Sequence, residues 1–278
     1  MAAAPPDLLT PAGVWALWRA ARERAPLVHC ITNFTSMDLM ANTLLAAGAS
    51  PAMAHALDEV EDFVGISDVL LVNASNLSAE WNAAKKLAAQ RAVALGKPWV
   101  FDPVGCGATP YRTTVCAQLL RLGPDVVRGN ASEIIALAGV EGSAVRGVDS
   151  TAGSHEALGA AKALARRCGC IVAVSGATDL VTDGTRVVGV SNGVPLLTRV
   201  TATGCSLTAL IAALLAAAPA GAALEAAAAG LAVFGLAGEV ALANAPRPGP
   251  GSLRAGLLDA LSLLGEDEIT RGVKIAEL

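Results

Sequence analysis

The fold is decided by the stretch Pro98-Trp-Val-Phe-Asp102-Pro-Val-Gly105-Cys-Gly107-Ala-Thr109. It contains a short apolar run, a carboxylate and a glycine-containing turn, and we expect a helix to begin near Arg112. The apolar run is too short for a free-standing helix and predicts a buried strand. Ligands in open α/β sheets gather at the carboxyl ends of the strands, so Asp102 is a candidate for holding a metal ion or a polar substrate. The pattern alone leaves a second interpretation open, in which Asp102 only caps the turn.

Short apolar runs alternate with helical patterns on both sides of this stretch. Buried strands alternating with helices predict a mostly parallel sheet covered on both faces. Asp183-Gly184 separates two further strands, 180–182 and 186–191, and predicts a hairpin. After Thr203 the pattern is almost entirely helical, with an interruption at 246–251. We expect strands at 27–31, 69–72, 99–101, 126–127 and 171–174, and helices at 37–47, 57–66, 78–95, 112–122, 131–138 and 154–167.

The composition raises the question of a membrane protein, because 54% of the residues are apolar and the mean hydropathy is +0.54. The most apolar stretch, 206–243, is interrupted by Pro219-Ala-Gly221 and carries Glu225 and Glu239. It therefore predicts buried core helices rather than a membrane span. The first residues show no basic region followed by an apolar run, so no secretory signal is expected. No linker divides the chain, and we expect residues 1–278 to form a single domain.

Charge and cysteine usage exclude further classes. A net charge of −4 and no basic run longer than a pair argue against a nucleic-acid surface. Six scattered cysteines without a CxxC motif indicate a reducing compartment, which favours a cytoplasmic location. Three histidines without metal-ligand spacing argue against zinc.

Two other stretches carry groups suited to phosphates. In Arg128-Gly-Asn130-Ala-Ser-Glu133 a strand ends in arginine, and Asn130 and Glu133 have the spacing of a capping box. The arginine and the carboxylate would suit phosphate oxygens and Mg²⁺, although the pair could serve only as a helix cap. In Thr201-Ala-Thr203-Gly204-Cys205-Ser206 a turn opens into a long apolar helix, whose N-terminus predicts an anion site. Cys205 would lie where a thiol pKa tends to fall, or it is simply a small buried residue.

The N-terminal part of the chain supplies candidates for a small-molecule pocket. Asn33 and Met53 each follow an apolar segment and could line such a pocket. His29 and His55 are more typical of histidines that make one structural hydrogen bond.

Taken together, these stretches resemble the hydroxyethylthiazole kinase family, whose members are ribokinase-like vitamin kinases. The resemblance runs in order from about residue 10 to 265. The matching motifs are Pro26-Leu-Val-His-Cys-Ile-Thr-Asn33, Ala41-Asn42, Leu44-Leu45, Gly48-Ala-Ser-Pro-Ala-Met53, Asp102-Pro-Val-Gly105, Gly107-Ala-Thr-Pro-Tyr-Arg112, Arg128-Gly-Asn-Ala-Ser-Glu133, Gly147-Val-Asp-Ser150, Asn192-Gly193, Pro195-Leu-Leu-Thr198 and Gly249-Pro-Gly-Ser252.

The resemblance implies a three-layer α/β/α ribokinase-like fold and Mg²⁺-dependent transfer of the ATP γ-phosphoryl group. The acceptor would be the primary alcohol of 4-methyl-5-(2-hydroxyethyl)thiazole, in thiamine salvage. It also implies a homotrimer with its sites at subunit interfaces, and no nucleic-acid or membrane partner. The residue roles that it implies are Mg²⁺ binding for Asp102 and Glu133, ATP binding for Arg128, Ser175 and Thr203, thiazole binding for Asn33, Met53, Ala202 and Gly204, and catalysis for Cys205 beside the attacking hydroxyl.

Three departures from the family pattern keep alternatives open. The anion turn begins with Ala202 where the family usually has glycine, Ser75 replaces another glycine, and Ala177 replaces a glutamate. The alternatives are a kinase of a different small alcohol, a catalytically weak nucleotide-binding relative and an ADP-dependent hydrate dehydratase. The dehydratase would be expected to have aspartate in place of Cys205.

Overall fold

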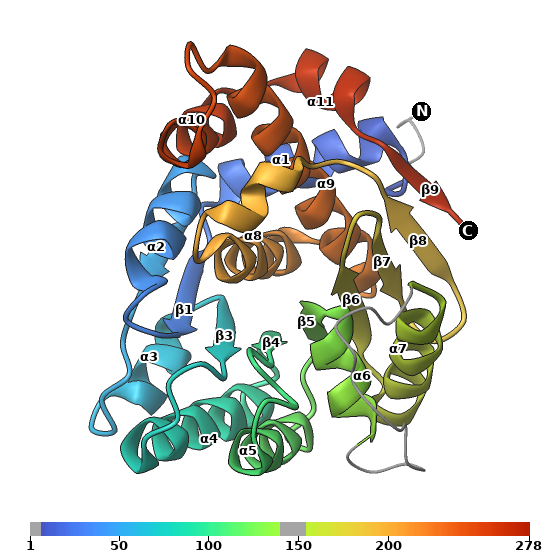
Figure 1. The fold of residues 1–278 in the computed structure, drawn as a ribbon. Helices are drawn as coiled ribbons and strands as arrows, with labels where there is room; N and C mark the ends of the chain where they lie inside the picture. Colours follow the sequence, from blue (N-terminus) through green and yellow to red (C-terminus); the bar gives the residue numbers. More distant parts are fainter. Residues whose placement is uncertain (1–6, 140–153) are drawn as a thin grey trace, which may run out of the picture.

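One nine-stranded sheet organises the molecule. A computed structural model describes residues 7–139 and 154–278, and in them the strand order is β2-β1-β3-β4-β5-β6-β7-β8-β9 (Figure 1). The six strands β2, β1, β3, β4, β5 and β6, in this spatial order, pair in parallel. Strands β7, β8 and β9 follow β6 and pair antiparallel. The strands are β1 (Leu27–Ile31), β2 (Ser50–Ala52), β3 (Val69–Asn73), β4 (Trp99–Asp102), β5 (Val126–Asn130), β6 (Ile171–Ser175), β7 (Asp179–Thr182), β8 (Val187–Val190) and β9 (Ile275–Glu277).

Helices cover both faces of this sheet and make three layers (Figure 1). One face carries α3 (Val60–Ile66), α4 (Ala79–Ala94), α5 (Pro110–Leu120), α6 (Ala131–Gly139) and α7 (Ser154–Cys168). The other face carries α1 (Pro11–Arg24), α2 (Met37–Ala46), α8 (Thr203–Ala217), α9 (Ala223–Asn244), α10 (Pro250–Leu263) and α11 (Glu266–Gly272), with the short 3₁₀ helix η1 (Pro195–Arg199) leading to α8.

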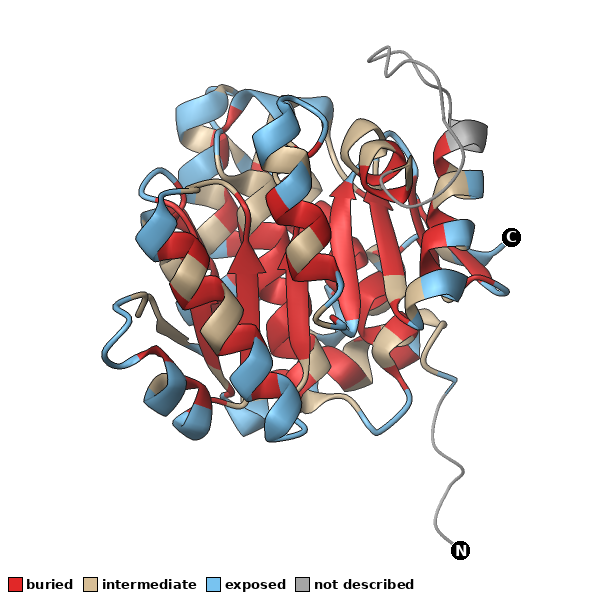
Figure 2. Ribbon diagram, turned by 90° about the horizontal axis from the view of Figure 1, so that it is seen from below, coloured by how far each residue is buried: buried red, intermediate tan, exposed pale blue. Residues whose placement is uncertain are grey.

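The strands are buried on both sides, as the apolar runs predict. In β3, Val69 and Leu71 belong to the core beneath α8 and α9, while Leu70 and Val72 belong to the core beneath α4 and α5. Figure 2 shows the same arrangement, with buried strands behind helices whose outer faces are exposed. The mostly parallel sheet flanked by helices is therefore confirmed.

The most apolar stretch of the sequence forms α8 and α9. In the described part of the chain, α9 alone is long and apolar enough to cross a membrane, and 78% of its most apolar window is buried inside the protein. Small residues let the two helices pack closely, since a Cβ on Gly230 would come within 2.6 Å of Ile211 Cγ1. The prediction of core helices over 206–243 is confirmed for this segment.

The structure adds four elements that the sequence patterns did not reveal, namely α1, β2, the 3₁₀ helix η1 and β9. The helix α1 begins after Thr10, whose hydroxyl accepts the Gly13 N–H. The strands β2 and β9 have only three residues each and leave several side chains exposed, so they lack a clear apolar signal. The Gly147-Val-Asp-Ser150 motif lies outside the described residues.

Candidate active site

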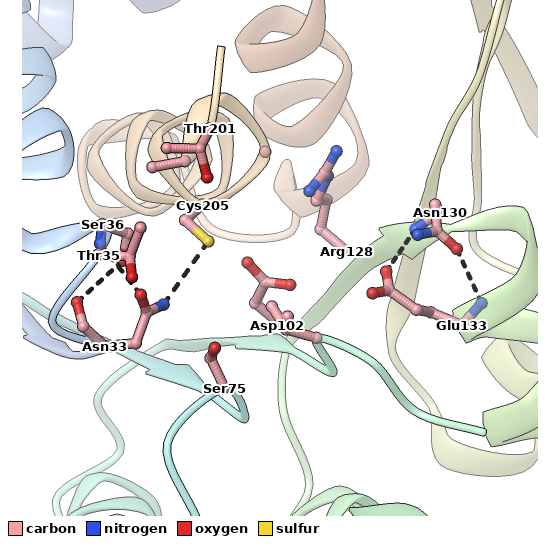
Figure 3. Close-up of a pocket in the computed structure, with 13 residues that line it drawn as sticks. Asn33, Thr35, Ser36, Ser75, Asp102, Arg128, Asn130, Glu133, Thr201 and Cys205 are labelled. Atoms are coloured by element: carbon pink, nitrogen blue, oxygen red, sulfur yellow. Dashed lines mark hydrogen bonds between the residues drawn. The ribbon is translucent and has the colours of Figure 1, made fainter. Parts of the chain in front are cut away.

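A polar cleft of about 410 Å³ opens at the carboxyl ends of the central strands, beside the N-terminus of α8 (Figure 3). Seven of the residues proposed from the sequence or its resemblance line it, and the lining residues as a whole come from five separate segments of the chain. The lining residues are Asn33, Thr35, Ser36, Ser75, Asp102, Val104, Arg128, Asn130, Glu133, Thr201, Ala202, Gly204 and Cys205.

Asp102 is the last residue of β4 and is completely buried. Its Oδ2 accepts hydrogen bonds from Asn73 Nδ2 and Thr208 Oγ1, both at 3.0 Å. Its Oδ1 is buried and accepts no hydrogen bond from any described residue. Burial raises the pKa of this carboxyl to about 6, although the Arg128 guanidinium acts in the opposite direction. One oxygen is thus held by the protein and the other is left for a ligand or a cation.

Arg128 lies on β5 and reaches toward the first turn of α8. Its Nη2 donates to Ser175 Oγ at 2.7 Å, which orients the guanidinium. A Cβ on Gly204 would come within 2.8 Å of Arg128 Nη1, so a larger residue at this position would displace the guanidinium. The arrangement places a positive charge beside a helix N-terminus, and both favour anions.

The capping box predicted at Asn130 and Glu133 is confirmed. The Asn130 side chain accepts the Glu133 N–H at 2.9 Å, and Glu133 Oε2 accepts the Asn130 N–H at 2.9 Å. Glu133 Oε1 also accepts the Gly105 N–H at 2.7 Å. Glu133 therefore both caps α6 and fixes the loop that follows Asp102, where Gly105 has φ +71°.

The α8 helix begins with a left-handed residue that is not glycine. Ala202 is its N-cap with φ 69° and makes no side-chain cap hydrogen bond. The first N–H groups of a helix have no intrahelical partner, and Ala202, Gly204 and Cys205 of this turn line the cleft. The turn is therefore suited to an anion.

Cys205 lies between two asparagines, and its thiol pKa differs from the expected one. Asn73 Nδ2 is 3.3 Å and Asn33 Nδ2 is 3.9 Å from its Sγ. Burial raises the pKa of the Cys205 thiol to about 12, and the Asp102 charge acts in the same direction. The expectation of a lowered thiol pKa was wrong, because burial outweighs the lowering effects of the Arg128 charge and of the hydrogen bond from Asn73.

Three residues implied by the resemblance do not line the cleft. Ser175 lies behind it as the acceptor for Arg128. The Thr203 hydroxyl donates to Val200 O at 3.0 Å and to Leu197 O at 3.2 Å, so it caps the end of η1. Met53 is partly buried and packs against the apolar core.

Other residues of the site carried no recognisable motif. Thr35 and Ser36 line the cleft, and Asn73 and Thr208 hold Asp102 from below. The one sequence signal for Asn73 is its position: it ends an apolar run just as Asp102 does, and the two are paired in register on neighbouring strands.

Comparisons with known proteins show the family and the fold of this chain. A model of the hydroxyethylthiazole kinase family matches residues 19–267. A hydroxyethylthiazole kinase from Zea mays is 52% identical over 265 residues, which cover 94% of this chain and 92% of that protein. A solved hydroxyethylthiazole kinase from Pyrococcus horikoshii is 41% identical and superimposes with a TM-score of 0.87, over 95% of this chain and 98% of that one. A pyridoxal kinase from Staphylococcus aureus is 17% identical with a TM-score of 0.62, over 91% and 97% of the two chains, and shares the fold.

Proposed function

The chain belongs to the hydroxyethylthiazole kinase family, and we propose that its cleft transfers the γ-phosphoryl group of ATP to the primary alcohol of 4-methyl-5-(2-hydroxyethyl)thiazole, in thiamine salvage. One observation carries the proposal. An arginine, a buried carboxylate with one free oxygen and the open first turn of α8 converge on a single cleft. Phosphoryl transfer needs positioning and charge neutralisation more than covalent chemistry, and these groups supply both.

Arg128 and the first turn of α8 bind the phosphates. The guanidinium offers planar N–H donors for phosphate oxygens, and the exposed backbone N–H groups of the turn add further donors. The contact of Arg128 with Gly204 aligns the two donor sets. In the proposed assignment Ser175 and Thr203 serve ATP binding indirectly, Ser175 by orienting Arg128 and Thr203 by fixing the turn.

Asp102 and Glu133 fit a Mg²⁺ ion with its waters. Mg²⁺ is usually held by one or two carboxylates together with waters and substrate phosphates. The free Oδ1 of Asp102 suits direct or water-mediated binding, whereas both Glu133 oxygens already accept backbone N–H groups and suit contacts to the ion's waters. The ion would neutralise phosphate charge when bound.

Asn33, Ala202, Gly204 and Cys205 form the acceptor side of the cleft. The Cys205 thiol stays protonated at neutral pH, so it positions the attacking hydroxyl rather than removing its proton as a thiolate. Met53 contributes through the backbone of its loop, where Met53 O accepts a hydrogen bond from His55 Nδ1 at 3.3 Å.

An aromatic patch beside the cleft, in which Phe34 is exposed and Trp81 is buried, favours a subunit interface there, as a homotrimer with its sites between subunits would have. Phe34 follows cleft-lining Asn33 and is 72% exposed. It packs edge-on against Trp81, on which His55 stacks. Burial of such a patch in a subunit interface would remove it from water and place the cleft beside a neighbouring subunit. We also propose that residues 1–278 act as one kinase domain in the cytoplasm, without a nucleic-acid or membrane partner.

Steady-state kinetics test the proposal. The wild type should phosphorylate the thiazole alcohol with ATP and Mg²⁺, and Arg128→Ala should lower kcat/KM by at least about 100-fold. Arg186→Ala is a matched control, because Arg186 forms surface ion pairs with Asp183 and Glu225. It should leave the kinetic constants unchanged. Turnover of another small alcohol in place of the thiazole would favour the alternative acceptor, and nucleotide binding without any turnover would favour a catalytically weak relative.

A further inference from the structure

Asn73 ends β3 directly beneath the cleft and is completely buried. Its registered neighbour on β4 is Asp102. A buried asparagine at such a point must satisfy its amide within the protein, because an unpaired buried polar group costs stability.

The Asn73 amide uses all of its hydrogen-bonding capacity. Its Nδ2 donates to Asp102 Oδ2 at 3.0 Å and to Cys205 Sγ at 3.3 Å. Its Oδ1 accepts from Asn33 Nδ2 at 3.2 Å and from the Ser75 N–H at 2.9 Å. An asparagine side chain can donate two hydrogen bonds through its nitrogen and accept two at its oxygen. Four partners from four segments of the chain therefore use its full capacity.

These partners also fix which way the amide faces. A flipped amide would set its oxygen against the Asp102 carboxylate and its NH₂ group against two N–H donors. Both contacts would be repulsive, so the orientation follows from the surrounding groups.

The four partners belong to both sides of the proposed reaction. Asn33 and Cys205 lie on the acceptor side, and Asp102 lies on the phosphate side. We propose that Asn73 is a positioning residue, which holds the Cys205 thiol and the Asp102 carboxylate at a fixed separation through one nitrogen and orients the Asn33 amide. This role rests on the proposed kinase function of the cleft.

The remaining contacts indicate which constants should change. Without Asn73, Asp102 still has Thr208, whereas Cys205 loses its contact to the Asn73 amide and keeps the longer contact to Asn33 and the one to Ser36. Asn33 loses the oxygen acceptor for its Nδ2 and keeps only the longer contact to Cys205 Sγ for that nitrogen, although its Oδ1 still accepts the Ser36 N–H. Arg128 has no hydrogen bond to Asn73 among the described residues, and its bond to Ser175 is unaffected. The substitution should therefore weaken binding and positioning of the alcohol more than binding of ATP.

The test compares Asn73→Ala with Asn82→Ala. Asn82, on α4, is also buried, and its amide donates to Leu77 O before α4 and to the Tyr111 hydroxyl on α5; none of these three residues lines the cleft. Asn73→Ala should lower kcat about 10- to 100-fold, because small displacements of reacting groups have effects of this size. It should raise the KM for the alcohol and leave the KM for ATP within about twofold. Asn82→Ala should lower the Tm but leave the kinetic constants within about twofold.

A second measurement does not depend on turnover. Asn73→Asp keeps the size of the side chain but has at most one donor, an O–H group, which would go to Asp102. Cys205 would then lack the N–H donor that Asn73 supplies. Alkylation of Cys205 by iodoacetamide at pH 9, followed by mass spectrometry of its peptide, should be at least about threefold slower in this variant.

Unchanged kcat in Asn73→Ala together with unchanged alkylation in Asn73→Asp would overturn the proposal. An equal kinetic loss in Asn82→Ala would overturn it too, because the effect would then be only structural. A wild type that does not phosphorylate the thiazole alcohol would overturn the proposed function instead, and the alkylation rates would still decide the role of Asn73.

Discussion

Replacing Ala202 by glycine should relieve strain at the start of α8. Ala202 has φ 69° and ψ 0°, and the left-handed conformation costs a residue with a Cβ about 1–2 kcal/mol. Glycine removes this strain but gains freedom in the unfolded chain, which offsets about 0.4–1 kcal/mol. The expected net gain is about 0.5–1 kcal/mol before any loss of packing by the Ala202 methyl group.

Ala25 provides a matched control for this substitution. It is the left-handed C-cap of α1, with φ 47° and ψ 56°, and it is exposed, whereas Ala202 is half-buried against the core. Ala25→Gly therefore reports the strain alone, and the difference between the two variants reports the packing of the Ala202 methyl group.

Urea unfolding and thermal melts measure both effects. For a chain of 278 residues, a gain of about 1 kcal/mol corresponds to a Tm rise of about 1–2 °C. Ala202→Gly should also keep kcat within about threefold, because the backbone of the anion turn is unchanged. If both variants are destabilised, the strain argument is refuted. If Ala202→Gly alone loses stability, the methyl group contributes packing that exceeds the strain.

Four further predictions concern the site and its surroundings. Cys205→Ser should keep kcat/KM within about tenfold in steady-state assays, because the thiol stays protonated and positioning dominates phosphoryl transfer; loss of all activity would contradict this. Asp102→Asn should lower kcat by at least about 100-fold but not the free energy of unfolding, because a buried carboxylate with a raised pKa is replaced by a neutral amide; a marked fall in the urea midpoint would be inconsistent with that reasoning. Burial lowers the pKa of Lys85 from its ordinary 10.5 to about 7, so between pH 7 and 10 the unfolded chain binds one more proton at Lys85 than the folded chain does. As pH rises through this range, the free energy of unfolding of the wild type should therefore increase relative to that of Lys85→Met, by at most about 1.4 kcal/mol per pH unit. A pH-independent difference would show that Lys85 keeps its ordinary pKa. Phe34→Glu should lower the sedimentation mass from trimer toward monomer, and an unchanged mass would remove the aromatic patch from the proposed interface.

Most strands and helices with a strong apolar pattern could be predicted from the sequence, but not all of their ends: the strand expected at 126–127 runs to Asn130, and the helix expected from residue 57 begins at Val60. The strand 27–31 is observed with the expected bounds, and the reciprocal cap of Asn130 and Glu133 forms as its spacing predicts. Both features depend on neighbours in the chain. Strands β2 and β9 depend instead on their pairing with β1 and β8 at the sheet edges, so their own residues carry little signal.

The electrostatics of the site could not be predicted in the same way. The position of Cys205 at a helix N-terminus suggested a lowered thiol pKa, but its burial and the Asp102 charge come from the packing of three distant segments. The hydrogen bonds that Asn73 and Thr208 make to Asp102 join residues 29 and 106 positions apart. Contacts at such separations follow from strand order and register, which local patterns do not specify.

Product analysis tests the central claim most directly. Incubation of the protein with ATP, Mg²⁺ and 4-methyl-5-(2-hydroxyethyl)thiazole, followed by mass spectrometry, should show the thiazole monophosphate and ADP formed in equal amounts, and Arg128→Ala should form almost none. Formation of ADP without phosphorylated thiazole, or equal product from the wild type and Arg128→Ala, would contradict the account.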